Sequence, residues 1–433
     1  MEEVLAQAKK VADAAEVFEI SSEETQAHFE ANRLKQLQTN QSTSVALRII
    51  KNGRIGYATT TGAGDTGELV ASAVETAAFG TEAKFRLPGA QDYPKVSTFD
   101  AAVASVPIKN MIRLGEAMIA AVAAHTPGIL CDAGVSRGII GVRILNSRGG
   151  QAAYRKSFFS LSIEGTLIEG TDMLFVGESD SSCHPLSDTK KVTDVVLRQL
   201  DLAKNRAKAP TRQLPVVFTP DGVTALVMPL ISAFNGKTVL EGASPVGDKV
   251  GKLVFDKKLN LRDDPTVAYR PGSRPCDDEG VPSQRTPLIS KGIVRGFLYD
   301  LQTAALAGKK STGNGSRGRG GLPTPSTSAL VVTPGNTTFD AMVADIKEGL
   351  VVEQLMGAEQ GNILGGDFSG NVLLGYKIEN GKMVGRVKDT MVSGNVYKIL
   401  KDIAAIGSET KWVGGFLQTP PLYCQGLSVS SKG

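Results

Sequence analysis

The sequence predicts an α+β protein in two lobes, in which helices pack on antiparallel sheets and the second lobe is sheet-rich. Three observations lead to this expectation. The 433 residues exceed what a single hydrophobic core usually supports, so two domains are expected. The 48 glycines exceed an average composition and indicate many tight turns. Segments of alternating apolar and polar residues end in Asn-Gly or Gly-rich turns, which is typical of hairpins.

The first half of the chain starts with a helical pattern and continues with strands. Residues 2–17 place apolar side chains at helical spacing and predict an amphipathic helix. Residues 44–61 alternate around Asn52-Gly53, a dipeptide suited to positive φ, and predict a hairpin. Further strands with Gly-rich turns are expected across 142–180.

Helices are expected to cover this first sheet. One begins at Asp65, which forms a capping-box pattern with Glu68. Others are predicted at 109–125 and 193–206. We therefore expect residues 1–207 to form an N-terminal α+β domain.

A linker and a sheet-rich C-terminal domain are expected to follow. Residues 208–215 are polar, contain two prolines and form the predicted linker. Residues 216–433 form the predicted second domain. Near its start, Thr219 and Pro220 provide the cap and the first residue of a helix that reaches Phe234.

Hairpins recur in the second domain. They are predicted at 288–300 and at 375–388, the latter around an Asn-Gly turn. A short helix is predicted across 342–353. Residues 308–325 show no pattern of a helix or strand, and their basic, Gly-rich composition predicts a mobile loop.

Composition narrows the cellular context. The net charge of +4 is small, and Lys and Arg are scattered among Asp and Glu, so charge does not indicate a nucleic-acid partner. Four cysteines lie far apart without a CxxC pair, which favours a reducing compartment, and we expect the cytoplasm. No apolar run reaches the roughly 18 residues of a membrane span, and no signal region is recognised, so no membrane association is expected.

Few residues carry the pattern of a metal or nucleophile site. None of the three histidines lies three to five residues from another, so no His-based zinc helix is expected. Adjacent Cys183 and His184 would point to opposite faces of a strand, which favours a solvated loop over a metal site. The sequence has no G-x-S-x-G elbow. No catalytic or metal-binding residue is predicted from these patterns.

The densest polar segment is Asp277-Asp278-Glu279, followed by Gly280 and, further on, Arg285. Three carboxylates in a row could act as acid and base or hold a cation. Acidic residues before a glycine are also typical of a tight turn. The segment is therefore either a functional cluster or a structural turn.

The basic residues of the 308–325 loop suggest a second kind of contact. Arg317 and Arg319 could touch nucleic acid as part of a disordered arm. No aromatic side chain lies between them, so nucleic acid is not the expected partner.

Several ordered blocks of the sequence resemble the TldD/PmbA family, whose PmbA branch is also called TldE. The blocks are RLKQLQTNQSTSVALRIIKNGRIGYATTTG from Arg33, DDEGVPSQRTPLISKGIVRGFLYDLQTAALAG at 277–308, STGNGSRG, SALVVTPG, and GGDFSGNVLLGYKIENGK from Gly365. Together they span nearly the whole chain. The resemblance implies peptide-bond hydrolysis by a TldD/TldE heterodimer, in which only TldD-type subunits carry a His-Glu-x-x-x-His helix for zinc.

This sequence departs from the zinc helix of TldD-type subunits. The equivalent helix begins at Asp221, and the two His and the Glu are replaced by Pro229, Leu230 and Phe234, none of which could bind zinc or act as a base. The family's third ligand is a C-terminal Cys, and Cys424 is displaced from that position. The resemblance is therefore to the PmbA/TldE branch, with no cofactor in this chain and zinc expected only in a TldD-type partner.

Three functional hypotheses follow. In the first, the chain is a non-catalytic subunit that pairs with a TldD-type subunit, or with itself, and encloses extended or unfolded peptides for proteolysis or peptide maturation. In the second, it is a regulatory binding protein, as the family's older label of DNA gyrase modulator suggests. In the third, it is an autonomous hydrolase that uses Asp277, Asp278 and Glu279. A dimer interface is expected at the hairpins 288–300 and 375–388, whose edges would otherwise be exposed.

Overall fold

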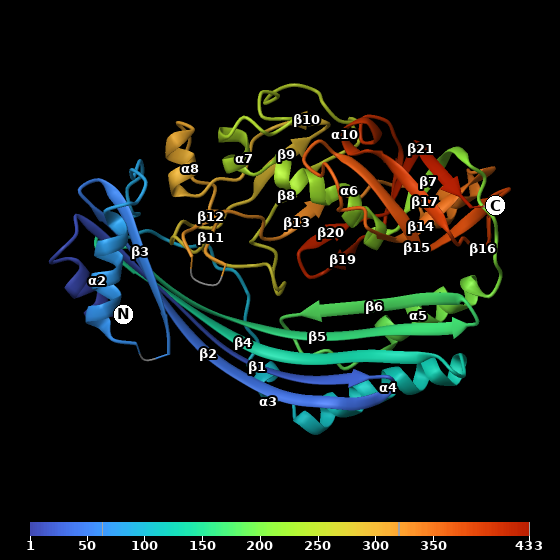
Figure 1. Cartoon of the computed structure of the whole chain (residues 1–433), viewed down its shortest axis with the longest axis horizontal. Coiled ribbons are helices and arrows are strands. Elements are labelled where there is room, and N and C mark those ends of the chain that lie inside the picture. Colours follow the sequence, from blue (N-terminus) through green and yellow to red (C-terminus); the bar gives the residue numbers. More distant parts are fainter. Residues whose placement is uncertain (63, 319–320, 433) are drawn as a thin grey trace.

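The computed structural model describes residues 1–62, 64–318 and 321–432. The predicted α+β class is confirmed, because helices pack on antiparallel sheets and the later half of the chain is mainly sheet (Figure 1). Within the described residues, no helix combines the length and the apolar character that crossing a membrane requires.

The first half of the chain builds one long, curved antiparallel sheet (Figure 1). Its strand order is β3-β2-β1-β4-β5-β6, so β3 and β6 stand at the two edges. The strands are β1 (Ala14–Glu30), β2 (Arg33–Lys51), β3 (Arg54–Thr61), β4 (Leu130–Asn146), β5 (Gln151–Glu169) and β6 (Asp172–Ser182).

Helices cover the two ends of this sheet. Near β3 lie α1 (Glu2–Ala8) and α2 (Thr66–Ala77), α3 (Ala102–Ser105) and α4 (Ile108–His125) lie under the sheet, and α5 (Lys190–Ala203) packs beside β5 and β6 (Figure 1). The predicted cap of α2 is confirmed, since the Asp65 carboxylate accepts hydrogen bonds from the backbone N–H groups of Gly67 and Glu68 at 2.6 and 3.1 Å.

The second half contains a sheet that closes on itself. Its ring is β14-β7-β21-β17-β15, and β14 pairs with β15 to close it. Strands β16 and β18 extend the ring at β15 and β21. The bounds are β7 (Arg212–Phe218), β14 (Glu348–Met356), β15 (Asp367–Glu379), β16 (Lys382–Arg386), β17 (Thr390–Asn395), β18 (Ile403–Ile406) and β21 (Leu422–Ser431).

A second six-stranded sheet packs beside the ring. Its order is β10-β9-β8-β13-β20-β19, and only β13 and β20 run parallel. The bounds are β8 (Leu261–Asp263), β9 (Thr286–Ser290), β10 (Ile293–Val294), β13 (Leu330–Val332), β19 (Lys411–Val413) and β20 (Leu417–Thr419), with a small pair β11 (Gly315–Ser316) and β12 (Thr324–Pro325). The helices of this half are α6 (Pro220–Ala233), α7 (Gly236–Leu240), α8 (Leu301–Leu306), α9 (Phe339–Ala344) and α10 (Val396–Ile399).

The hairpins predicted around Asn-Gly turns are confirmed. Asn52 and Gly53 join β2 to β3 with φ of +50° and +71°. Asn380 and Gly381 join β15 to β16 with φ of +46° and +76°. Both residues of each turn have positive φ, which Asn and Gly adopt more readily than other residues.

The two halves of the molecule share one hydrophobic core. Met118 of α4 and Phe159 of β5 belong to the same buried cluster as Val217 of β7 and Tyr376 of β15. The first sheet is therefore packed against the closed sheet of the second half.

Two predicted helices are wrong in extent because strand pairing overrides local helical spacing. The helix predicted at 2–17 ends at Ala8, and the residues from Ala14 onward pair with β2. The helix predicted at 342–353 ends at Ala344, and residues from Glu348 onward form β14, which lies in the ring between β7 and β15. Long-range pairing partners decide such segments, and local spacing does not reveal them.

The predicted linker, residues 208–215, overlaps strand β7. Its last residues, Arg212–Pro215, begin strand β7, and Leu214 is buried. The division of the chain into domains at 1–207 and 216–433 stays a prediction.

Candidate functional site

Helix α6 packs within the second half of the chain, against β14 of the closed sheet and against β19 and β20. Thr219 caps it, and Pro220 is its first residue, as predicted. Gly222 lies so close to β14 that a Cβ atom there would come 2.4 Å from the carbonyl oxygen of Val352. A residue without a side chain therefore lets α6 approach the closed sheet.

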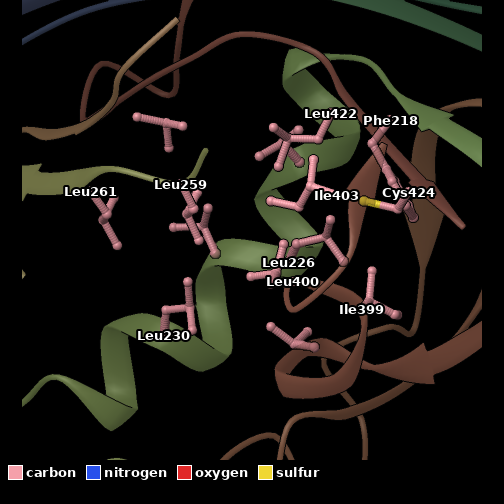
Figure 2. Close-up of a cluster of buried hydrophobic side chains, with 14 of the residues drawn as sticks. Phe218, Leu226, Leu230, Leu259, Leu261, Ile399, Leu400, Ile403, Leu422 and Cys424 are labelled. Carbon is pink, nitrogen blue, oxygen red and sulfur yellow. The ribbon is translucent and has the colours of Figure 1, made fainter. Parts of the chain in front are cut away.

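The positions predicted to replace the zinc ligands lie in apolar surroundings. Pro229, Leu230 and Phe234 are all buried, and Leu230 and Phe234 belong to the hydrophobic core, whereas Pro229 also borders a cavity on the other face of α6. Figure 2 shows Leu226 and Leu230 pointing from α6 into a cluster of aliphatic side chains that also holds Cys424. Burial raises the pKa of the Cys424 thiol to about 12, which disfavours the thiolate that zinc binds. These residues do not fit a zinc ion.

A groove borders the other face of α6, and strands β5 and β6 of the first sheet line part of it. It consists of three adjoining cavities of about 500, 280 and 380 Å³. Asp221, in the first turn of α6, lines all three. Met228 and Pro229 line the third, so the groove follows α6 over about two turns.

An ion cluster lines the first of these cavities. Lys411 Nζ lies 2.5 Å from Glu178 Oε2 and 2.8 Å from Asp221 Oδ2. Although burial alone would lower it, these two carboxylates hold the pKa of Lys411 above its ordinary value. Burial outweighs the lysine for Glu178 and raises the pKa of that carboxyl.

Glu353 of β14 is a further carboxylate of the groove. It is only 4% exposed. Its Oε2 accepts a hydrogen bond of 2.7 Å from Gln199 Nε2, and its Oε1 lies 3.7 Å from Arg198 Nη2. Burial raises the pKa of Glu353. No sequence pattern indicated Glu178, Asp221, Glu353 or Lys411, because they come from separate segments without a shared motif.

The predicted polar segment 277–279 lies elsewhere, in a buried ionic network between the first sheet and the second half. Arg48 of β2 contacts Glu279 Oε1 at 2.6 Å and Glu16 Oε1 at 3.0 Å. Arg317 forms an ion pair with Glu16. Two arginines and two glutamates from distant segments therefore link the halves of the molecule.

The two aspartates of the segment shape its loop. The Asp277 carboxylate accepts hydrogen bonds from the backbone N–H groups of Glu279, Val281 and Gly315 at 2.8 to 3.0 Å. Asp278 accepts one from the backbone N–H of Arg317 at 2.9 Å. These contacts are those of a structural turn, the interpretation that acidic residues before a glycine favoured.

Burial makes the carboxyl groups of this network harder to ionise. It raises the pKa of both Asp277 and Glu279, against the opposing effects of Arg274 on the first and Arg48 on the second. A signal for the network was present in the sequence. Glu16 and Arg48 are single charges within the apolar runs AAEVF and SVALRII, a pattern that favours buried ion pairs.

The predicted residues Arg285 and Arg317 lie in different surroundings. Arg285 lies apart from the network, where its exposed side chain pairs with Asp264 at 2.8 Å. Arg317 is buried, which does not support the possibility that it forms part of an accessible basic arm. Its partner Glu16 is 301 residues away in the chain and could not be identified from sequence spacing. Arg319 lies outside the described residues. The mobility of the 308–325 loop stays a prediction.

The pair Cys183-His184 has contacts that local spacing did not predict. His184 Nδ1 lies 2.7 Å from Asp100 Oδ2, and Cys183 is buried. Among the described residues, no three His, Cys, Asp or Glu side chains are grouped closely enough to hold a metal ion.

Two family models match this chain, one near its start and one over its second half. A family model described as PmbA/TldA metallopeptidase C-terminal domain matches residues 211–431, and one described as PmbA/TldA metallopeptidase domain 1 matches residues 15–79. The chain is 26% identical over 396 residues to an uncharacterized protein of Methanocaldococcus jannaschii, covering 89% of this chain and 90% of that protein.

Other similar proteins carry the names of both branches. A metalloprotease TldD homologue of Haemophilus influenzae is 30% identical over 217 residues, which are 50% of this chain and 45% of that protein, so the match spans about half of each. The crystal structure of TldE from Thermococcus kodakarensis has the same fold, with a TM-score of 0.92 at 22% identity and complete coverage of both chains. Because one family model alone matches more than half of the 433 residues, this chain belongs to the PmbA/TldD metallopeptidase family.

Proposed function

We propose that this chain is a non-catalytic subunit of a TldD/TldE-type zinc metallopeptidase and that it acts with a TldD-type partner on extended peptides. The main observation behind this proposal is that α6 packs into a hydrophobic core at the positions of the zinc ligands. Leu230 and Phe234 are 2% and 0% exposed, and Cys424 lies in the same core. A helix that would hold zinc and its base in a catalytic subunit serves here as a packing element.

The groove beside α6 supports a role in holding peptides. Strand β6 forms one wall, and among the described strands only β5 pairs with it. The backbone N–H and C=O of Gly177 on this edge are already bonded by the Gln199 side chain, so a peptide would bind through the side chains that line the groove. A subunit without catalytic groups could contribute binding surface in this way.

The first sheet has a second open edge that supports pairing with another chain. Strand β3 pairs with β2 only at Ser44–Lys51. Residues 33–43 of β2 have no pairing strand on that side among the described residues, and Leu34 and Leu37 are 43% and 44% exposed. Exposed edges of this kind invite pairing with another strand. The hairpins 288–300 and 375–388 are the other proposed contact regions.

The two alternatives have less support. A DNA-binding regulator, acting on DNA gyrase for example, was suggested by the basic loop, but Arg317 is engaged in an internal ion pair. An autonomous hydrolase would need accessible carboxylates, whereas Asp277 and Glu279 are fully buried. A cytoplasmic location fits the four cysteines, which are free and buried.

The proposal can be tested by reconstitution. Peptide hydrolysis and zinc content are measured for this chain alone, for a TldD-type subunit alone and for their mixture. We expect no hydrolysis and no stoichiometric zinc for this chain alone, and hydrolysis in the mixture that exceeds that of the TldD-type subunit. Hydrolysis by this chain alone, or stoichiometric zinc that is lost in a Cys424→Ser variant, would contradict the proposal.

A further inference from the structure

Strand β2 leaves a long part of its outer edge without a partner. Strand β3 pairs with it only at Ser44–Lys51, and Figure 1 shows β2 continuing along the sheet beyond the end of β3. The carbonyl oxygen of Thr43 still accepts a hydrogen bond from the Gly62 N–H at 2.9 Å. On residues 33–42, no described residue bonds the backbone groups that point away from β1. This open edge is about 33 Å long.

The middle of the open edge lacks the features that usually protect strand edges from pairing. Charged side chains, prolines and bulges serve that purpose in natural sheets. Residues 36–42, QLQTNQS, contain no charge and no proline, and all of them are exposed. The register shift against β1 lies opposite residues 34–36, so the rest of the edge is regular. Another strand could therefore pair with it along most of its length.

The register shift gives the open edge an apolar side. Leu34 pairs with Phe29, and Leu37 pairs with Ala27, so both leucines lie on the face of the sheet that packs on α4. Phe29 and Ala27 are buried in that core, whereas Leu34 and Leu37 are 43% and 44% exposed. A strand added at the open edge would cover these two leucines and extend the core.

The charges at the two ends of the open edge are complementary. Arg33 and Lys35 lie at its start, where Glu30 contacts Lys35 at 3.3 Å and offsets one of the two positive charges. Glu23 and Glu24 of β1 lie beside its other end. In an antiparallel pair of identical segments, the start of each meets the end of the other. Such pairing brings opposite charges together and keeps like charges apart.

We propose that two copies of this chain pair antiparallel through residues 33–42 of β2, which joins their first sheets into one continuous sheet across a two-fold axis. The amide and hydroxyl side chains in the middle of the segment both donate and accept hydrogen bonds, so they can face their own copies. The inference goes beyond the proposed function, because it concerns contact between two copies of this chain and requires no TldD-type subunit.

Cysteine cross-linking of the intact chain tests this arrangement. The four native cysteines are buried, so a cysteine added at an exposed position is the one that a mild oxidant reaches. Each residue from 36 to 41 is replaced by cysteine in turn. Equivalent residues of the two copies move apart by about 7 Å for each step away from the axis. We expect the yield of disulfide-linked dimer to be highest at one position and to fall on both sides of it. Glu75→Cys, at an exposed position of α2, is the control that should not cross-link.

A charge placed near the axis should weaken the dimer. In Gln38→Lys, like charges of the two copies would lie close together in the middle of the open edge. Sedimentation equilibrium over a concentration series should show a dimer for the wild type and a dimer Kd at least about tenfold weaker for this variant. Gln360→Lys makes the same change at an exposed position of the second half and should leave the Kd unchanged.

The outcomes separate this inference from the proposed function. A wild-type chain that stays monomeric, or a cross-linking yield that is equal at all positions from 36 to 41, would overturn the two-fold pairing. A dimer that Gln38→Lys weakens no more than Gln360→Lys would overturn its assignment to β2. The role beside a TldD-type subunit is judged by the reconstitution assay alone, so each proposal can fail without the other.

Discussion

Replacing Arg48 tests whether the buried ionic network holds the two halves of the protein together. Arg48 is 3% exposed and lies 3.0 Å from Glu16 and 2.6 Å from Glu279, which are both 0% exposed. Arg48→Met keeps most of the side-chain volume and removes the charge. Glu16 retains Arg317, but Glu279 loses its ion-pair partner.

The expected loss of stability follows from leaving a carboxylate buried without its cation. Removing one partner of a buried ion pair typically costs about 3–5 kcal/mol in the free energy of unfolding. Part of this cost is relieved when Glu279 takes up a proton, so the loss should be larger at pH 8 than at pH 5. Urea unfolding followed by circular dichroism and by the fluorescence of Trp412, the single tryptophan, measures it.

Arg143→Met is the matched control. Arg143 lies on β4 of the same sheet and also faces two carboxylates, Glu2 at 2.8 Å and Glu19 at 3.5 Å, but its side chain is 46% exposed. An exposed pair of this kind contributes about 0–1 kcal/mol. If Arg48→Met costs no more than Arg143→Met, the network does not stabilise the packing of the two halves and the reasoning is refuted.

Three further changes test α6 and the titration of the network. Gly222→Ala should cost about 1–3 kcal/mol, because its Cβ would meet the Val352 carbonyl; unchanged thermal unfolding would show that α6 can shift away. Leu230→Ala should lower the free energy of unfolding in urea by about 2–5 kcal/mol, because Leu230 is buried. Met228→Ala, at an exposed position of the same helix, should lower it by less than about 1 kcal/mol. Equal losses in the two variants would contradict the packing role of the Leu230 face of α6. Burial raises the folded-state pKa of Glu279, so between pH 4.5 and that pKa the folded state binds more protons than the unfolded state. The stability of wild type relative to Glu279→Gln should therefore be greatest below pH 4.5 and fall as pH rises through the folded-state pKa. A stability difference that rises with pH would contradict this prediction.

Local sequence patterns identified those elements that depend on neighbouring residues. Turn chemistry located the hairpin at Asn52-Gly53, because positive φ is a property of the residues themselves. Capping located the starts of α2 at Asp65 and α6 at Thr219, because the cap bonds only the next few N–H groups. The same patterns overextended the helix at 342–353, where pairing with distant strands decides the outcome.

For the candidate site, the sequence alone determined the absence of zinc-binding side chains at Pro229, Leu230 and Phe234, because the capacity to bind a metal is a property of each side chain. Only the tertiary structure decided what surrounds them. It brought Glu178 and Glu353, from strands 175 positions apart in the chain, to line one cavity, and it buried Arg317 against Glu16. Ion pairs and cavities depend on distances between segments remote in sequence, and those distances are set by the packing of the two halves on each other.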